Sequence, residues 1–177
     1  MTKLCSVLIL TLASVAVMAG QTNNEWIRYE SSEGRYSVSL PREPKASSQE
    51  STASTGEKLP QYLATTIEGN GAFLVGYFDY TPQMTFSLDK ARDGMLNSMN
   101  ATSLAEEMIS LSGAPGRAVK LLAKASDGQE FIDRARLYDV AKRVYILQCI
   151  FPKTEESPTV IEKCDKFFDS FKVSTRQ

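Results

Sequence analysis

Residues 62–80 read YLATTIEGNGAFLVGYFDY and contain the strongest turn signal in the chain. Two runs that suit β-strands, 62–68 and 72–80, flank the turn Gly69-Asn70-Gly71. An Asn-Gly pair readily adopts the positive φ values that a two-residue hairpin turn requires. The second run is apolar at both odd and even positions, which indicates a strand that is buried on both faces. The segment therefore predicts an antiparallel hairpin that other elements must cover on both sides.

Further hairpins are expected on either side of this segment. The turn Ser126-Asp127-Gly128-Gln129 joins residues 117–124 to residues 130–139, and a short polar break then leads into residues 143–151. These three segments predict a meander whose last strand is again apolar on both faces. A weaker turn at Glu33-Gly34 pairs 26–31 with 36–41, where apolar and polar residues alternate as in a strand buried on one face.

The polar segment 43–60 has no apolar stripe and allows two interpretations. It is either a mobile loop or a polar edge hairpin that turns at Gly56.

Two segments have the signals of a helix. Ser157 is a good N-cap, Pro158 suits the first helical position, and apolar residues then recur at steps of three and four up to Phe171. A second helix is expected from Ser87 to about Ala101. Helices of this kind can cover both faces of the buried strands. The expected fold class is therefore α/β (α+β), a three-layer sandwich with a central antiparallel sheet covered by helices on both faces.

The first nineteen residues read as a cleavable export signal. The apolar run from Val7 to Val17 has the length of a signal-peptide core and is too short to span a membrane. Val17 and Ala19 place small residues three and one before a cut ahead of Gly20. An uncleaved N-terminal anchor is the alternative. We expect residues 1–19 to be removed and residues 20–177 to form one domain in the periplasm or outside the cell.

The composition argues against several functional classes. The chain has 42% hydrophobic and 23% charged residues and a formal net charge of −1, which is too apolar for disorder and too neutral for a dedicated nucleic-acid or membrane-surface binder. It contains no histidine, so the commonest general base, the commonest zinc ligand and every Ser-His or Cys-His nucleophile pair are absent. We therefore expect a protein that is not an enzyme and has no catalytic residue, metal site or cofactor.

Cys149 and Cys164 are the two cysteines that remain after signal cleavage, and an oxidising compartment permits them to pair. A helix that folds back on its strand places them at similar depth. If the helix axis stands about 10 Å above the sheet, the two Cα atoms are roughly 7 to 8 Å apart, beyond the usual disulfide range. A disulfide and two separate buried thiols both remain open.

Three arginines form a candidate partner-binding patch. Arg134 and Arg136 share one face of their strand, and Arg143 begins the neighbouring strand. Such a patch suits a carboxylate or an acidic partner. The alternative is an ordinary solvated surface, because acidic residues lie close by in the sequence.

Two other motifs carry less information. Glu106 and Glu107 are adjacent in an expected strand and point to opposite faces, so they cannot act as a paired acid and base. Asn100-Ala101-Thr102 fits an N-glycosylation acceptor, which matters only in a eukaryotic secretory pathway.

The order of elements, together with four short motifs, resembles the PsbP-like family. The motifs are Tyr36-Ser-Val-Ser-Leu-Pro41, the turn Gly113-Ala-Pro-Gly-Arg117, Arg143-Val-Tyr-Ile-Leu-Gln148 and the terminal Phe168-Asp-Ser-Phe171. The resemblance covers nearly all of residues 20–177 and implies an antiparallel sheet sandwiched between helices. The family includes extrinsic photosystem subunits, exported bacterial proteins and a Ran-binding nuclear import factor, so membership implies architecture more than activity. Photosystem members use histidine in metal contacts, which this chain lacks.

The function expected from this reasoning is an exported, non-catalytic protein-binding or assembly accessory module. Its partner is an unknown protein of the envelope or extracellular space, with no nucleic acid and no stable membrane insertion after signal cleavage. The alternative is a carrier of a small apolar ligand held between sheet and helix. The aromatic residues that suggest a carrier are Phe73, Tyr77, Tyr145, Phe167 and Phe168.

Overall fold

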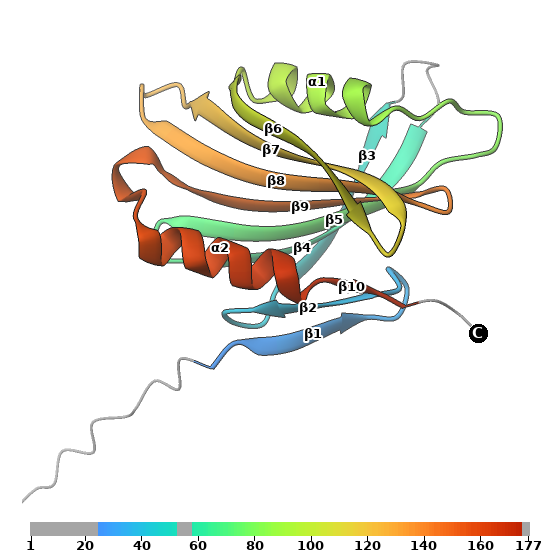
Figure 1. Cartoon of the computed structure of the whole chain (residues 1–177), viewed down its shortest axis with the longest axis horizontal. Helices are drawn as coiled ribbons and strands as arrows, with labels where there is room; N and C mark the ends of the chain where they lie inside the picture. Colours follow the sequence, from blue (N-terminus) through green and yellow to red (C-terminus); the bar gives the residue numbers. More distant parts are fainter. Residues whose placement is uncertain (1–24, 53–57, 175–177) are drawn as a thin grey trace, which may run out of the picture.

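The computed structural model describes residues 25–52 and 58–174. Within them the chain forms two antiparallel sheets and two α-helices (Figure 1). The strands of the seven-stranded sheet are, in order across it, β3 (Lys45–Thr52), β4 (Lys58–Glu68), β5 (Gly71–Asp79), β9 (Arg143–Pro152), β8 (Glu130–Val140), β7 (Ala114–Lys124) and β6 (Thr102–Leu111). The three-stranded sheet has the order β1 (Ile27–Ser31), β2 (Tyr36–Leu40) and β10 (Lys172–Val173).

The expected antiparallel sheet is confirmed, but the three-layer sandwich with helices on both faces is wrong. The described chain is mainly strand, and its two α-helices are α1 (Leu88–Ser98) and α2 (Pro158–Ser170), with a 3-10 turn η1 (Lys153–Glu155) before α2. In Figure 1, α2 and the small sheet lie on one side of the large sheet and α1 lies on the other. Strands that are apolar on both faces require cover, but the sequence does not say whether a helix or a second sheet provides it. Here a second sheet provides much of it.

The main core lies between the large sheet, α2 and the small sheet. The small sheet contributes the apolar residues of its alternating strand, Tyr36, Val38 and Leu40, all of which are at most 3% exposed. From α2 come Cys164, Phe167 and Phe168. The one-sided pattern of residues 36–41 therefore marks a strand that packs face to face on the large sheet.

A smaller core joins α1 to the other face of the large sheet. Leu88, Ala91 and Met95 pack against Val119 and Leu121 of β7. None of the residues of α1 is fully buried. This helix therefore covers β7 and β8 and leaves the remainder of this face to half-buried residues of β4, β5 and β9.

Local signals placed most elements correctly. Ser157 caps α2 and Ser87 caps α1, each accepting a hydrogen bond from a backbone N–H three residues later. The hairpin of residues 62–80 is present, but its two-residue turn is Gly69-Asn70 rather than Asn70-Gly71, because Glu68 pairs with Gly71. Gly69 has the positive φ, +59°, that this tight turn requires.

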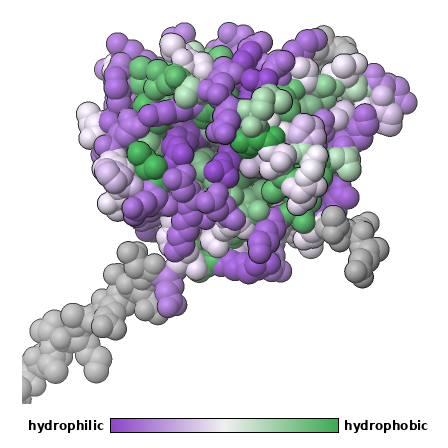
Figure 2. Space-filling model, in the orientation of Figure 1, coloured by the Kyte–Doolittle hydropathy of each residue, from purple (hydrophilic) through white to green (hydrophobic). Residues whose placement is uncertain are grey.

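Of the two interpretations for residues 43–60, the edge hairpin is the observed one, because β3 pairs with β4. The expected turn at Gly56 lies outside the described residues, as do the export signal 1–19 and the cut ahead of Gly20. No helix in the described part of the chain is long and apolar enough to cross a membrane. Figure 2 shows hydrophobic groups scattered among hydrophilic ones on the face in view, so that face has no single continuous apolar surface.

Candidate functional site

The strand β6 forms one edge of the large sheet, and most of its residues are exposed. Within residues 25–52 and 58–174 it pairs with β7 and with no other strand. Leu104 and Met108 on this strand are 49% and 66% exposed, which makes them two of the three exposed large apolar residues of the described chain. An unpaired edge of this kind presents backbone N–H and C=O groups to any strand that approaches it.

The register of β6 is regular over most of its length. A β-bulge shifts the pairing with β7 between Ser103 and Ala105, and from Ala105 to Leu111 the pairing is continuous. Bulges protect an edge from unwanted pairing where they occur. Here the bulge is confined to the start of the strand, so the segment that carries Met108 keeps the geometry of an open edge.

The opposite edge of the sheet differs in chemistry. Strand β3 reads KASSQEST, and residues 45–50 are all exposed. Charged and small polar residues at an edge discourage pairing with another chain. The two edges are therefore not equivalent, and β6 is the more suitable one for a partner strand.

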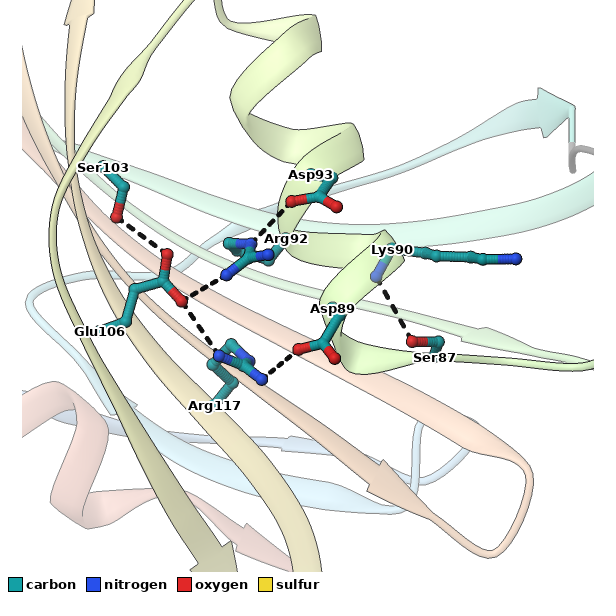
Figure 3. Close-up of polar contacts among 8 residues, drawn as sticks. All are labelled: Ser87, Asp89, Lys90, Arg92, Asp93, Ser103, Glu106 and Arg117. Atoms are coloured by element: carbon teal, nitrogen blue, oxygen red, sulfur yellow. Dashed lines mark hydrogen bonds and ion pairs between the residues drawn. The ribbon is translucent and has the colours of Figure 1, made fainter.

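An ion-pair cluster fixes β6 and β7 to α1 (Figure 3). One carboxylate oxygen of Glu106 on β6 accepts hydrogen bonds from Nη1 of Arg92 at 2.5 Å and from Nη1 of Arg117 at 3.0 Å. The other oxygen accepts from the hydroxyl of Ser103 at 3.0 Å. Arg117 also donates to Asp89 at the start of α1. Glu106 thus connects a helix to two strands.

The cluster lies at the surface, and its side chains are partly covered by one another. The side chains of Arg117, Arg92 and Glu106 are 15%, 22% and 26% exposed. Partial burial raises the pKa of Glu106, but the hydrogen bonds from Ser103 and the two arginines outweigh that effect and lower the pKa below its usual value. The carboxylate therefore stays ionised, and its charge is paired with the two arginines at the surface of the protein.

The three arginines of the candidate patch lie on one face of the large sheet but do not form one exposed surface. Arg134 pairs with Asp165 and Arg136 with Asp169, both on α2. The guanidinium of Arg136 also lies 4.8 Å from the ring centre of Phe168. These two arginines therefore hold α2 against β8.

Arg143 is separated from this pair by burial. It is 7% exposed, and its Nε and Nη2 each donate to a carboxylate oxygen of Asp79 at 2.6 Å. Its Nη1 donates to the backbone carbonyl of Glu33 at 2.7 Å. These hydrogen bonds hold the pKa of Asp79 below its usual value. The expectation of one patch containing all three arginines is corrected here, because strand position alone did not show that Asp79 and the β1–β2 turn surround Arg143.

Cys149 on β9 and Cys164 on α2 are joined by a disulfide in the structure. Their Cα atoms are 5.7 Å apart, closer than the 7 to 8 Å estimated for a helix at ordinary height above a sheet. Both residues are almost completely buried, at 2% and 0% exposure. The disulfide attaches α2 to the central strand of the large sheet.

Comparison with known proteins shows which known fold this architecture resembles. No protein-family model matches the sequence, and no curated protein matches it. The solution structure of cyanobacterial PsbP (CyanoP) from Synechocystis sp. PCC 6803 is similar over 91% of this chain and 99% of that chain, with a TM-score of 0.62 and 12% identity. This chain has a PsbP-like fold. At this level of identity the similarity concerns the fold alone.

Two other solved structures are more distant. A Pseudomonas aeruginosa protein of unknown function, described as a putative regulator, has a TM-score of 0.47 and 9% identity, with 86% of this chain and 98% of that chain covered. A protein of Bacteroides thetaiotaomicron has a TM-score of 0.44 and 12% identity, with 81% and 47% covered.

Within this PsbP-like fold, the aromatic residues that suggested a ligand carrier contact one another. The ring centres of Phe73 and Phe167 are 5.4 Å apart, and those of Phe167 and Phe168 are 5.2 Å apart. Tyr77 and Tyr145 are likewise neighbours in the core, at 6.4 Å. All five are at most 5% exposed. They pack in the main core between the large sheet, the small sheet and α2.

Sequence reasoning missed two polar features of this chain. The first is the cluster around Glu106, for which the sequence excludes only an acid and base pair with Glu107. The second is Asp133, which is fully buried on β8 and receives a hydrogen bond from Gln148. The available signal was that Asp133 shares its face of the strand with the apolar residues Phe131, Ala135 and Leu137. No group of three or more potential metal-ligating His, Cys, Asp or Glu side chains occurs in the part of the chain that the structure describes.

Proposed function

We propose that this chain is an exported, non-catalytic member of the PsbP-like family that binds a protein partner by accepting a strand at β6. The observation that carries the proposal is the open, regular edge from Ala105 to Leu111, with Met108 66% exposed at its centre. Strand addition at an exposed edge uses backbone hydrogen bonds for affinity and side-chain contacts for specificity.

The chemistry of β6 suggests the kind of strand that fits. Met108 is a flexible apolar residue, which suits a partner side chain that is also apolar. Glu107 points to the other face and makes no ion pair within the described residues. A partner strand with an apolar residue opposite Met108 and a basic residue opposite Glu107 matches both faces.

The cluster around Glu106 supports the proposal because it holds the edge in place. A strand tied to α1 through Arg92 and Arg117 loses little conformational freedom when a partner binds, and such preorganisation favours affinity. Since the charge of Glu106 is paired with these arginines, it protects the edge less than an unpaired charge would.

The export and non-catalytic parts of the proposal rest on the sequence. The N-terminal residues have the pattern of a cleavable signal, and the absence of histidine removes the usual nucleophile pairs. A non-catalytic binding role agrees with both.

Crosslinking in intact cells tests this function. A photoreactive residue placed at Glu107 should give a discrete adduct with one protein, and the additional change Met108→Gln should reduce the adduct about tenfold. The matched control is Ile67→Gln, because Ile67 is 58% exposed but lies on an internal strand. Both substituted proteins should melt within a few degrees of the unsubstituted one.

Two outcomes would contradict the proposal. One is an adduct that persists unchanged with Met108→Gln, and the other is an adduct that Ile67→Gln reduces to the same extent. In either case β6 is an ordinary sheet edge.

A further inference from the structure

The outer face of the small sheet contains a groove of about 410 Å³ that the proposed function does not use. Its walls come from β1, from the β1–β2 turn, from β2 and from Ser174 just after β10. None of these residues belongs to β6 or β7. The inner face of this sheet is apolar and packs on the core, whereas its outer face is formed by polar and charged residues.

Two guanidinium groups line the groove. Arg28 on β1 donates from Nε to Glu30 at 2.6 Å and from Nη2 to the hydroxyl of Ser37 at 3.1 Å, which leaves its Nη1 group to a further acceptor. Arg35 lies in the turn, and its side chain makes no hydrogen bond or ion pair within the described residues. A guanidinium with all five donors available fits carboxylate and phosphate oxygens in pairs.

The carboxylate whose pKa responds to the charge of Arg35 is already paired with another arginine. The charge of Arg35 contributes to the lowered pKa of Asp79, after the larger effect of Arg143. Both carboxylate oxygens of Asp79 accept hydrogen bonds from Arg143 at 2.6 Å. Arg35 therefore remains available to another anion.

Hydroxyl groups at the bottom of the groove add donors. Ser37 is only 5% exposed, and its Oγ accepts from Arg28, so its own hydrogen remains to be donated. Ser31 accepts from the backbone N–H of Gly34 at 2.9 Å. Lys172 on β10 is the register partner of Ser37 and is exposed, so a third positive charge lies beside the groove.

We propose that this groove binds a small oxyanion, the phosphate or carboxylate group of a small molecule. Arg35 and the free Nη1 of Arg28 would hold its oxygens, and Ser37 would donate from below. Glu30 is the one acidic residue lining the groove, and it competes for Arg28. Removal of the Glu30 charge should therefore free Arg28 and strengthen binding of an anion.

The experiment is a titration of ¹⁵N-labelled protein with inorganic phosphate and, separately, with sodium acetate, at constant ionic strength. Saturable shifts of the backbone amides of Ser31, Ser37 and Ser174 are expected. Arg35→Gln should weaken binding about tenfold, and Glu30→Gln should strengthen it about two- to fivefold. The matched control is Arg42→Gln, an exposed arginine outside the groove, which should leave binding unchanged.

The two anions distinguish the source of the oxyanion. Tighter binding of phosphate assigns a phosphate group, and tighter binding of acetate assigns a carboxylate. Shifts that do not saturate with either anion would overturn the proposal, as would equal weakening by Arg35→Gln and Arg42→Gln. Neither of these results would affect the proposal for β6, because the groove contains no residue of that strand.

Discussion

Asp133 on β8 accepts a hydrogen bond from Nε2 of Gln148 on β9 at 2.7 Å, while its other carboxylate oxygen has no partner within the described residues. Asp133 has no exposed surface, and its register partners on the neighbouring strands, Leu121 and Ile150, carry no charge. Burial raises the pKa of Asp133 from 3.8 to about 7, although the hydrogen bond from Gln148 opposes this change. The folded protein therefore favours the protonated form of this side chain.

This buried carboxyl should make the protein less stable as the pH rises. Since the folded state binds the proton more tightly than the unfolded chain, the contribution of Asp133 to the free energy of unfolding is greatest below about pH 4, falls as the pH rises to about 7, and is constant above that. The total change is on the order of 4 kcal/mol. Asp133→Asn should remove this dependence, so the variant should gain stability relative to the natural protein between pH 4 and pH 8. Urea unfolding at several pH values measures the difference; parallel curves for the two proteins would contradict the prediction.

Loss of the Glu106 carboxylate should loosen α1. Glu106→Gln should lower the free energy of unfolding by about 1 kcal/mol, because Arg117 and Arg92 would lose the charged acceptor of a surface ion-pair network. The control is Glu107→Gln, the next residue on the same strand, whose effect should stay within about 0.5 kcal/mol. Urea unfolding gives both values, and hydrogen exchange should show faster opening of α1 in the first variant only. Equal effects of the two substitutions would mean that the cluster adds nothing to stability.

The disulfide should account for a substantial part of the stability. It closes a loop with a sequence separation of 15 residues, for which the chain-entropy relation gives about 3 kcal/mol. Replacing both Cys149 and Cys164 by alanine should therefore lower the free energy of unfolding by about 2–4 kcal/mol. The control is the same protein in a reducing agent strong enough to open the disulfide, which should show a similar loss. Unchanged melting in both cases would contradict the prediction.

Two glycines should respond in opposite directions to substitution by alanine. At Gly116 on β7 a Cβ atom would lie 2.5 Å from Cδ1 of Tyr138 and 2.8 Å from the carbonyl of Leu137, so Gly116→Ala should destabilise the protein by about 1–3 kcal/mol. At Gly94 in α1 the added Cβ would meet no atom within 4 Å beyond its chain neighbours and the backbone of its own helix, so Gly94→Ala should stabilise the protein by about 0.5–1 kcal/mol. Melting temperatures measured in one buffer compare the two. A loss of stability with Gly94→Ala would show that α1 is constrained by something other than helix propensity.

What the sequence predicted correctly depends on residues close together in the chain. The hairpins follow from turns such as the one at Gly69, and the beginning of α2 follows from Ser157 and Pro158. The nature of the second cover layer did not follow, because β10, which completes the small sheet, has only two residues and no pattern of its own. Local sequence signals therefore predicted the strands and helices, but they did not predict how these elements are arranged in layers.

The candidate sites show the same limit. Arg143 looked like part of a surface patch because nothing near it in the chain reveals Asp79, which is 64 residues away. Glu106 looked isolated because Arg92 reaches it only after α1 has packed across β7. Predicting the exposed edge at Met108 requires the order of the strands in the sheet, which a sequence pattern does not give.

The small sheet joins the two ends of the described chain. Its β2 strand pairs with β1 and with β10, and the backbone N–H of Ser39 donates to the hydroxyl of Ser170, which is 131 residues away in the sequence. A ribosome makes the apolar face of Tyr36, Val38 and Leu40 first and the strand that completes its sheet last. This layer therefore closes late in folding, because the apolar face of β2 waits for α2 to cover it and the sheet itself waits for β10.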